Sequence, residues 1–135
     1  MGEAEKSSRN GHVSSDHPYV SICIPSYNKA KYIGETIDSV LAQTYPYYEI
    51  LVIDNASTDD TEKIINTQYR DRVVFYKNPT NMGYAYNFNR CISLAKYDYL
   101  LILPADDTIL PTFLEKTVPM LKQYPQAGFC RNWHK

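Results

Sequence analysis

The chain has 135 residues, enough for one domain that buries a continuous core without disulfide or structural-metal support. It has 14 lysines and arginines and 15 acidic residues, so the protein has no overall positive charge to attract a nucleic-acid backbone. Nucleic acid is therefore not the first partner that we expect. Cys23, Cys91 and Cys130 lie far apart in apolar runs, which excludes a disulfide framework or a zinc spacing and favours reduced core thiols.

Residues 1–18 are polar, almost free of large apolar side chains and closed by Pro18. Such a segment buries too little apolar surface to become ordered, so we expect a disordered tail and a folded domain over residues 19–135. No apolar stretch approaches the roughly 20 residues that span a bilayer, and no signal-peptide core follows the start. We therefore expect a cytoplasmic chain without a membrane-spanning segment.

From residue 19 onward, short apolar runs alternate with amphipathic segments. Residues 20–24 form a β-branched run that stops at Pro25, which predicts a buried strand. Apolar residues at the i, i+4, i+7 and i+8 positions predict a helix over 31–43. The remaining predicted elements are a strand at 49–53, a helix near 60–69, a strand at 73–76, a helix at 84–95, a strand at 97–103, a helix from Pro111 to about Tyr124 and a strand at 127–130. This order predicts an α/β fold with a mostly parallel sheet and helices on both faces.

Ligands of such a sheet bind beyond the carboxyl ends of its strands, and the loops that follow four predicted strands are polar. These loops are residues 25–28, 54–59, 78–83 and 104–107. Meeting at one edge, they would bring together an aromatic ring, amide and carboxylate oxygens, a glycine and an acidic pair. This combination suits a nucleotide and a divalent cation.

The acidic pair Asp106-Asp107 is the strongest candidate for the cation. Adjacent carboxylates repel each other unless a cation or hydrogen bonds relieve them, and Mg²⁺ or Mn²⁺ takes one or two carboxylates plus phosphate oxygens. The alternative is that Asp106, Asp107 and Thr108 cap the helix before Pro111. Asp54 and Asn55 have a similar alternative, a plain turn at the end of a strand.

Several catalytic systems are missing from the sequence of the predicted domain. Its histidines fall in the tail and next to the end, which leaves none for a Ser-His or Cys-His nucleophile. Neither a GxGxxG nor a GxxxxGK[ST] motif occurs, which counts against a nicotinamide site and a P-loop. Carboxylates and a metal ion must then carry any catalysis.

Six stretches from about residue 19 to the end form a family pattern by their order and spacing. They are 20–28 (VSICIPSYN), 37–44 (IDSVLAQT), 49–59 (EILVIDNASTD), 81–83 (NMG), 87–92 (NFNRCI) and 103–110 (LPADDTIL). The pattern resembles inverting glycosyltransferase family 2, whose members have the GT-A fold, a Rossmann-like and mostly parallel sheet. Many relatives read Asp-x-Asp-Asp where this chain has Pro104, and a branch ending in Ala-Asp-Asp is the most similar.

The resemblance implies a nucleotide-diphosphate-sugar donor, with Pro25 and Tyr27 beside the base and ribose. Asn55 stands where many relatives place an aspartate that hydrogen-bonds the base, which leaves the identity of the base open. Asp106 would face the ribose or a metal-bound water, and Asp107 would bind Mn²⁺ or Mg²⁺ directly. The full set of expected donor contacts is Pro25, Ser26, Tyr27, Asn28, Asp54, Asn55, Gly83, Asn89 and Asp106. Tyr84 and Tyr86 are further candidates for the crevice.

In the family, the metal neutralises the leaving diphosphate while a carboxylate base deprotonates the acceptor hydroxyl, here an unknown saccharide or lipid-linked acceptor. That base lies further along the relatives than this sequence extends, so we expect the donor-binding part of a truncated enzyme, with peripheral membrane association possible for the whole protein. Two alternatives stay open. One is a non-catalytic nucleotide-binding module, and the other a receiver-like signalling domain with Asp54 as phosphoacceptor. Lys29 and Lys31 are read as the charged start of a solvated helix rather than as diphosphate ligands.

Overall fold

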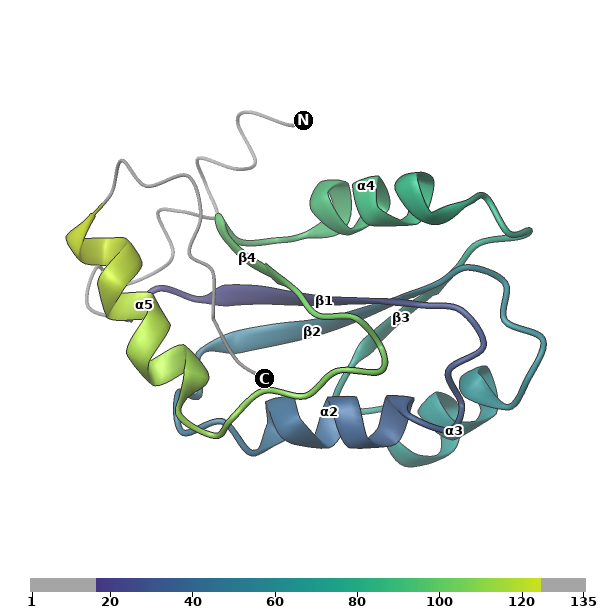
Figure 1. Ribbon diagram of the computed structural model, residues 1–135, viewed down its shortest axis with the longest axis horizontal. Coiled ribbons are helices and arrows are strands. Elements are labelled where there is room, and N and C mark those ends of the chain that lie inside the picture. The colour runs from purple at the N-terminus through teal and green to yellow at the C-terminus, as the bar shows by residue number, and fades with distance from the viewer. Residues whose placement is uncertain (1–16, 125–135) are drawn as a thin grey trace.

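The computed structural model describes residues 17–124, in which four strands alternate with four helices (Figure 1). The strands are β1 (Val20–Ser26), β2 (Tyr48–Asp54), β3 (Val74–Lys77) and β4 (Tyr99–Ile102). The helices are α2 (Ile33–Leu41), α3 (Thr61–Gln68), α4 (Tyr84–Leu94) and α5 (Phe113–Gln123).

The strands form one sheet in the order β3-β2-β1-β4, and every neighbouring pair is parallel. Helix α4 lies over one face of the sheet, while α2 and α3 lie over the other (Figure 1). The predicted α/β class, with a parallel sheet and helices on both faces, is confirmed.

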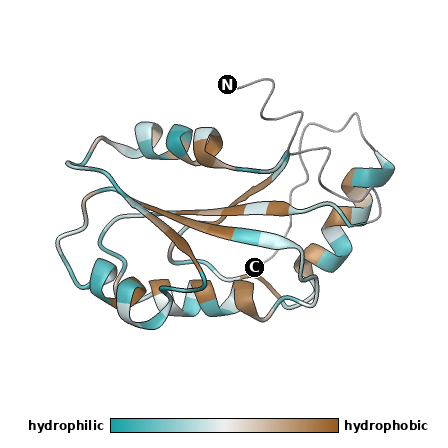
Figure 2. Ribbon diagram, turned by 180° about the vertical axis from the view of Figure 1, so that it is seen from behind, coloured by the Kyte–Doolittle hydropathy of each residue, from teal (hydrophilic) through white to brown (hydrophobic). Residues whose placement is uncertain are grey.

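The two faces of β1 enter two different cores, because successive side chains of a strand point to opposite faces. Ile22 and Ile24 join the core formed with α2, α3 and α5, whereas Cys23 joins a smaller core beneath α4. Figure 2 shows the hydrophobic strands between helices of mixed hydropathy. The continuous apolar run in the sequence is therefore the signature of a strand buried on both sides.

Cys23 and Cys91 are buried free thiols, as expected of core cysteines. The Cys23 thiol lies 3.5 Å from the carbonyl oxygen of Cys91, to which it donates. Its contact with Cys91, together with burial, raises the pKa of the Cys23 thiol, so this sulfur stays protonated and unreactive.

Most element bounds differ from the prediction by one or two residues, and two of these differences have a visible cause. Strand β4 is shorter than the predicted 97–103, because only residues 99–102 pair with β1. Helix α5 begins at Phe113 rather than at Pro111, whose carbonyl oxygen accepts a hydrogen bond from Thr44 N–H at 2.9 Å.

Two predictions fall on residues outside the described range. The tail predicted over 1–18 lies almost wholly outside it, as do the strand predicted at 127–130 and Cys130. Over residues 17–124, no helix is long and apolar enough to cross a membrane.

Candidate functional site

Three strands end level with one another at one edge of the sheet. Ser26 at the end of β1 pairs with Asp54 at the end of β2, and Asp54 pairs with Lys77 at the end of β3. The alignment continues into the next loop, because Asn55 N–H donates to the carbonyl oxygen of Ser26 at 2.8 Å. The polar loops predicted to converge therefore do so.

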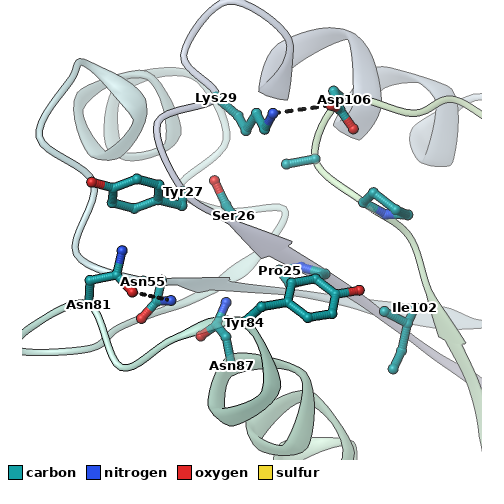
Figure 3. Close-up of a pocket in the computed structure, with 12 residues that line it drawn as sticks. Pro25, Ser26, Tyr27, Lys29, Asn55, Asn81, Tyr84, Asn87, Ile102 and Asp106 are labelled. Carbon is teal, nitrogen blue, oxygen red and sulfur yellow. Dashed lines mark hydrogen bonds and ion pairs between the residues drawn. The ribbon is translucent and has the colours of Figure 1, made fainter.

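A cavity of about 460 Å³ opens at this edge, a size typical of small-molecule sites (Figure 3). Segments that follow all four strands contribute to its walls, together with the first turns of α4. Its lining consists of Pro25, Ser26, Tyr27, Lys29, Asn55, Asn81, Tyr84, Asn87, Ile102, Pro104, Ala105 and Asp106. Five of these belong to the predicted donor contacts: Pro25, Ser26, Tyr27, Asn55 and Asp106. The predicted residues outside the lining are Asn28, Asp54, Gly83, Asn89 and Asp107.

Ser26 is a polar group that the fold leaves unpaired. Its side chain is 3% exposed, and its hydroxyl has no hydrogen-bond partner among the described residues. A buried hydroxyl without a partner is destabilising, and it is uncommon in folded proteins. Ser26 also lines the cavity, so this unpaired hydroxyl lies next to the space that a bound molecule would fill.

Asn28 holds two loops together instead of lining the cavity. Its backbone is left-handed (φ 51°), a conformation that asparagine tolerates better than most residues. Its N–H donates to the Ser57 hydroxyl at 2.8 Å, and its side-chain oxygen accepts from Thr58 N–H at 2.8 Å. Asn28 therefore fixes the loop that carries Tyr27 against the loop that follows β2.

Asp59 reinforces the same junction. Its carboxylate accepts hydrogen bonds from Ala30 N–H at 3.0 Å and from the Thr61 hydroxyl at 2.6 Å. Partial burial by itself raises the pKa of Asp59, but the hydrogen bonds from Thr61 and Ala30 outweigh it and hold this pKa below its ordinary value. The carboxylate is therefore an acceptor that is already engaged within the fold.

Asp54 is a structural carboxylate. It is fully buried, and its two oxygens accept from Ser57 N–H at 2.7 Å and from the Ser57 hydroxyl at 2.6 Å. Asp54 therefore stabilises a turn at the end of β2, which was the alternative to a binding role. Because its side chain is fully buried, it does not reach a ligand in the cavity. The receiver-like hypothesis fails for the same reason, because a phosphoacceptor must be reachable by solvent.

Asn55 is 5% exposed and faces both the cavity and the loop that follows β3. Its amide nitrogen donates to Asn81 Oδ1 at 3.0 Å and to the Gly83 carbonyl oxygen at 3.2 Å. Its amide oxygen accepts from Asn78 Nδ2 and Met82 N–H, each at 2.9 Å. Gly83 has a φ of 90°, a backbone conformation that glycine adopts most readily. Its contribution to the site is therefore the shape of the loop.

Helix α4 contributes Asn87 to the lining rather than the predicted Asn89. Asn87 is buried, and its amide nitrogen donates to the Ile53 carbonyl oxygen at 2.8 Å. Asn89 is exposed on the same helix. Tyr84 lines the cavity, whereas Tyr86 does not.

Lys29 and Asp106 form an ion pair at the cavity, with 3.1 Å between Lys29 Nζ and Asp106 Oδ2 (Figure 3). Both side chains are partly exposed, so the pair adds little to stability. Its position matters more, because it places a cation and a carboxylate side by side in the lining of the cavity. Lys29 therefore belongs to the site rather than to a solvated helix start.

The alternative that the acidic pair caps a helix is wrong. Helix α5 begins at Phe113, its N-cap is Thr112, and no side chain caps it. Asp106 and Asp107 are both exposed in the loop before it, and Asp107 N–H donates to the Pro104 carbonyl oxygen at 3.0 Å. Their carboxylates are free of a capping role.

The chemistry of the acidic pair fits a cation that arrives with a ligand. No group of three or more His, Cys, Asp or Glu side chains within residues 17–124 is arranged to hold a metal ion. Two exposed carboxylates leave most coordination positions of a Mg²⁺ or Mn²⁺ ion to phosphate and water oxygens. The residues therefore suit a metal shared with a diphosphate rather than a metal enclosed by protein.

The model of the family described as glycosyl transferase family 2 matches residues 21–135. The chain belongs to this family. Putative glycosyltransferase EpsE of Bacillus subtilis is 36% identical over 110 residues, which are 79% of this chain and 40% of EpsE. The putative teichuronic acid biosynthesis glycosyltransferase TuaG of the same organism is 35% identical over 78% of this chain and 43% of TuaG. The chain thus spans about two fifths of the length of these relatives.

Solved structures of similar fold confirm the family 2 architecture. Staphylococcus aureus TarS residues 1–349, solved in complex with UDP-GlcNAc, matches with a TM-score of 0.73 and 28% identity over 79% of this chain and 32% of that one. The mannosyltransferase PcManGT from Pyrobaculum calidifontis, solved with GDP-Man and Mn²⁺, matches with a TM-score of 0.62 and 28% identity over 68% of this chain and 28% of that one. The predicted GT-A type of fold is therefore confirmed.

The sequence reasoning missed several members of this family 2 site. They are Lys29, Asn81, Asn87, Ile102, Pro104 and Ala105. Asn81, Pro104 and Ala105 lay in predicted polar loops but had no assigned contact. A usable signal existed for Asn87, an amide on the otherwise apolar face of a predicted helix. Ile102 and Lys29 carry no such signal, because an apolar strand end and a lysine before a helix are both common.

Proposed function

We propose that this family 2 domain binds the nucleotide-diphosphate sugar of an inverting glycosyltransferase, which transfers the sugar to a hydroxyl of a saccharide or lipid-linked acceptor. The observation that carries the proposal is the unpaired Ser26 hydroxyl in a cavity at the carboxyl edge of a parallel sheet. A ligand with hydrogen-bonding groups at that depth satisfies this hydroxyl, and a sugar nucleotide has many.

The remaining cavity groups match the parts of such a ligand. The Tyr27 ring is 42% exposed and offers a face for a nucleobase to stack on. The Lys29 ammonium group lies near Asp106, where it can offset the charge of a diphosphate. TarS and PcManGT were solved with ligands of different bases, so the base that this chain prefers is left to measurement.

Asp107 and Asp106 are the residues that would hold a divalent cation. When bound, the cation offsets the negative charge that develops on the departing diphosphate. Asp106 would give up its contact with Lys29 to hold such a cation, which would leave the Lys29 ammonium group for a phosphate oxygen. We assign no catalytic base, because the one carboxylate in the cavity lining is that of Asp106.

Calorimetry with UDP, GDP and dTDP, each in manganese and in chelator, tests the proposal. We expect at least one diphosphate to bind, and to bind more tightly with manganese. A protein that binds none of the three in either condition would contradict the proposed function. Sugar-nucleotide hydrolysis by this chain and by a longer version would then separate donor binding from transfer, and full turnover by the 135-residue chain would show that its catalytic base is present.

Ser26→Ala is expected to weaken diphosphate binding about threefold to tenfold, the usual worth of one hydrogen bond, without loss of stability. The free protein loses nothing, because the hydroxyl has no partner there. Calorimetry measures the affinity, and thermal unfolding measures the stability.

Ser21→Ala is the matched control on the same strand. The Ser21 hydroxyl donates to Glu49 and accepts from the backbone of Lys96 and Tyr97. Its loss is expected to lower stability by about 1–3 kcal/mol and to leave diphosphate affinity unchanged. The opposite pattern, with Ser26→Ala unstable and fully able to bind, would show that Ser26 serves the fold.

A further inference from the structure

Four asparagine side chains lie together behind Tyr27 and connect the loop after β2, the loop after β3 and helix α4. This asparagine cluster consists of Asn55, Asn78, Asn81 and Asn87, and three of them line the cavity. An asparagine amide has a nitrogen that donates and an oxygen that accepts hydrogen bonds. The direction of each amide, meaning the sides that its nitrogen and its oxygen face, therefore matters as much as its position.

Backbone partners fix the direction of the Asn55 amide. Its oxygen accepts from Met82 N–H, which can only donate, and its nitrogen donates to the Gly83 carbonyl oxygen, which can only accept. The second donor position of the nitrogen is used by Asn81 Oδ1, and the second acceptor position of the oxygen by Asn78 Nδ2. Both donors and both acceptors of Asn55 are therefore engaged within the protein, and none is left for a ligand.

Asn55 in turn fixes the direction of Asn81. The Asn81 oxygen accepts from Gly83 N–H at 2.9 Å and from Asn55 Nδ2 at 3.0 Å. The Asn81 nitrogen is therefore on the other side, toward Tyr27, where no residue in the range 17–124 accepts from it (Figure 3). Of the four amide nitrogens of the cluster, that of Asn81 alone makes no hydrogen bond within residues 17–124, and it lies beside the aromatic face of the cavity.

The rest of the cluster makes this arrangement rigid. Asn78 is fully buried, and its nitrogen donates to Asn55 and to Asn87 Oδ1, each at 2.9 Å. Its oxygen accepts from Arg90 at 3.2 Å, and Asn87 is tied to the backbone of Ile53. Buried amides whose hydrogen bonds connect them to one another and to the backbone hold one conformation.

We propose that Asn81 Nδ2 is the specificity-determining donor of this site, and that Asn55 is a positioning residue that aims it. When a nucleobase stacks on Tyr27, the Asn81 amide nitrogen donates a hydrogen bond to an acceptor on the edge of the base. This acceptor is a ring nitrogen or a carbonyl oxygen. Asn55, at the position where many relatives place an aspartate, acts through Asn81 and the loop rather than on the base. The inference rests on the proposed binding of a nucleoside diphosphate.

Asn81→Asp tests the donor directly. The retained oxygen still accepts from Asn55 and Gly83, so the loop keeps its shape, but the group that faces the cavity becomes an acceptor. We expect the affinity for the preferred member of UDP, CDP and GDP to fall about tenfold and the order of preference among the three to change. Binding of inorganic pyrophosphate with manganese should stay within about twofold of the original, because the phosphate end does not contact Asn81.

Asn66→Asp is the control, since it makes the same change of charge at an exposed position of α3 outside the cavity. It should leave both the affinities and the order of preference unchanged. Equal behaviour of the two variants would overturn the role of Asn81, as would an original protein that binds UDP, CDP and GDP equally. If the original protein binds none of them, the proposed function itself fails.

Asn55→Asp tests the positioning role. It replaces the two donors by an oxygen that faces Asn81 Oδ1 and the Gly83 carbonyl oxygen, so the loop loses two hydrogen bonds and Asn81 loses its fixed direction. We expect a changed order of preference among the bases, with pyrophosphate binding kept. An unchanged order in a folded Asn55→Asp protein would show that Asn55 does not aim Asn81. Should this variant fail to fold, Asn81→Asp still decides the proposal.

Discussion

Asp107→Ala is expected to remove the manganese-dependent part of nucleoside diphosphate binding, lowering the affinity in manganese about a hundredfold, to the value measured in chelator. The reason is the small number of protein ligands. Because the described residues hold no cluster of three metal-ligating side chains, Asp107→Ala would leave the cation with Asp106 as its one carboxylate of the acidic pair, which we expect to be too few to hold it. Calorimetry with and without manganese measures both quantities on one sample.

Asp71→Ala is the matched control for the change of charge. Asp71 is exposed in the turn before β3, at the opposite ends of the strands from the cavity. It should bind the diphosphate as the original protein does. Diphosphate binding that ignores both the chelator and the Asp107 substitution would refute the metal role of the acidic pair.

The second large effect concerns stability. Asp54→Ala is expected to lower the free energy of unfolding by about 2–3 kcal/mol, because it removes the acceptor of two hydrogen bonds in the interior. The Ser57 backbone N–H loses its partner, and the Ser57 hydroxyl loses one of two while still accepting from Asn28. Denaturant unfolding followed by circular dichroism measures the change.

Asp60→Ala provides the comparison for Asp54→Ala. Asp60 is exposed at the start of α3 and makes no capping hydrogen bond, so its loss should change the free energy of unfolding by less than about 0.5 kcal/mol. Similar stabilities of the two variants would show that the buried carboxylate contributes little. Incubation of the original protein with acetyl phosphate should leave Asp54 unmodified, because this side chain is fully buried.

The division of roles within the loop after β2 illustrates how the site is built. Asp54 is turned inward and holds the loop, whereas Asn55 is turned toward the loop after β3 and holds Asn81. Neither side chain is left with a free hydrogen-bonding group for a ligand. The groups that would bind a ligand belong instead to residues that Asp54 and Asn55 position. A substitution of Asp54 should therefore change stability, and a substitution of Asn55 should change the preference among bases.

Much of this molecule was predictable from its sequence. Apolar runs stopped by Pro25, Asp54 and Asn78 reveal strands, and the polar residues that follow each run mark the carboxyl edge of a parallel sheet as the place of the site. Chain order alone then assigns Pro25, Ser26 and Tyr27 to that edge. The fold class and the location of the cavity follow from runs of a few neighbouring residues, and the family from the order and spacing of six such stretches.

Only the tertiary structure decided which polar atoms are free. Lys29 meets Asp106 across 77 positions of sequence, and Asn55 meets Asn81 across 26, so no local pattern reveals either contact. The sequence shows that Asp54, Asn55 and Ser26 are polar. In the fold, the side chains of Asp54 and Asn55 are hydrogen-bonded within the protein, whereas the Ser26 hydroxyl has no partner among the described residues. The availability of an atom to a ligand depends on what the fold has already bound to it, and that is set by packing between distant segments.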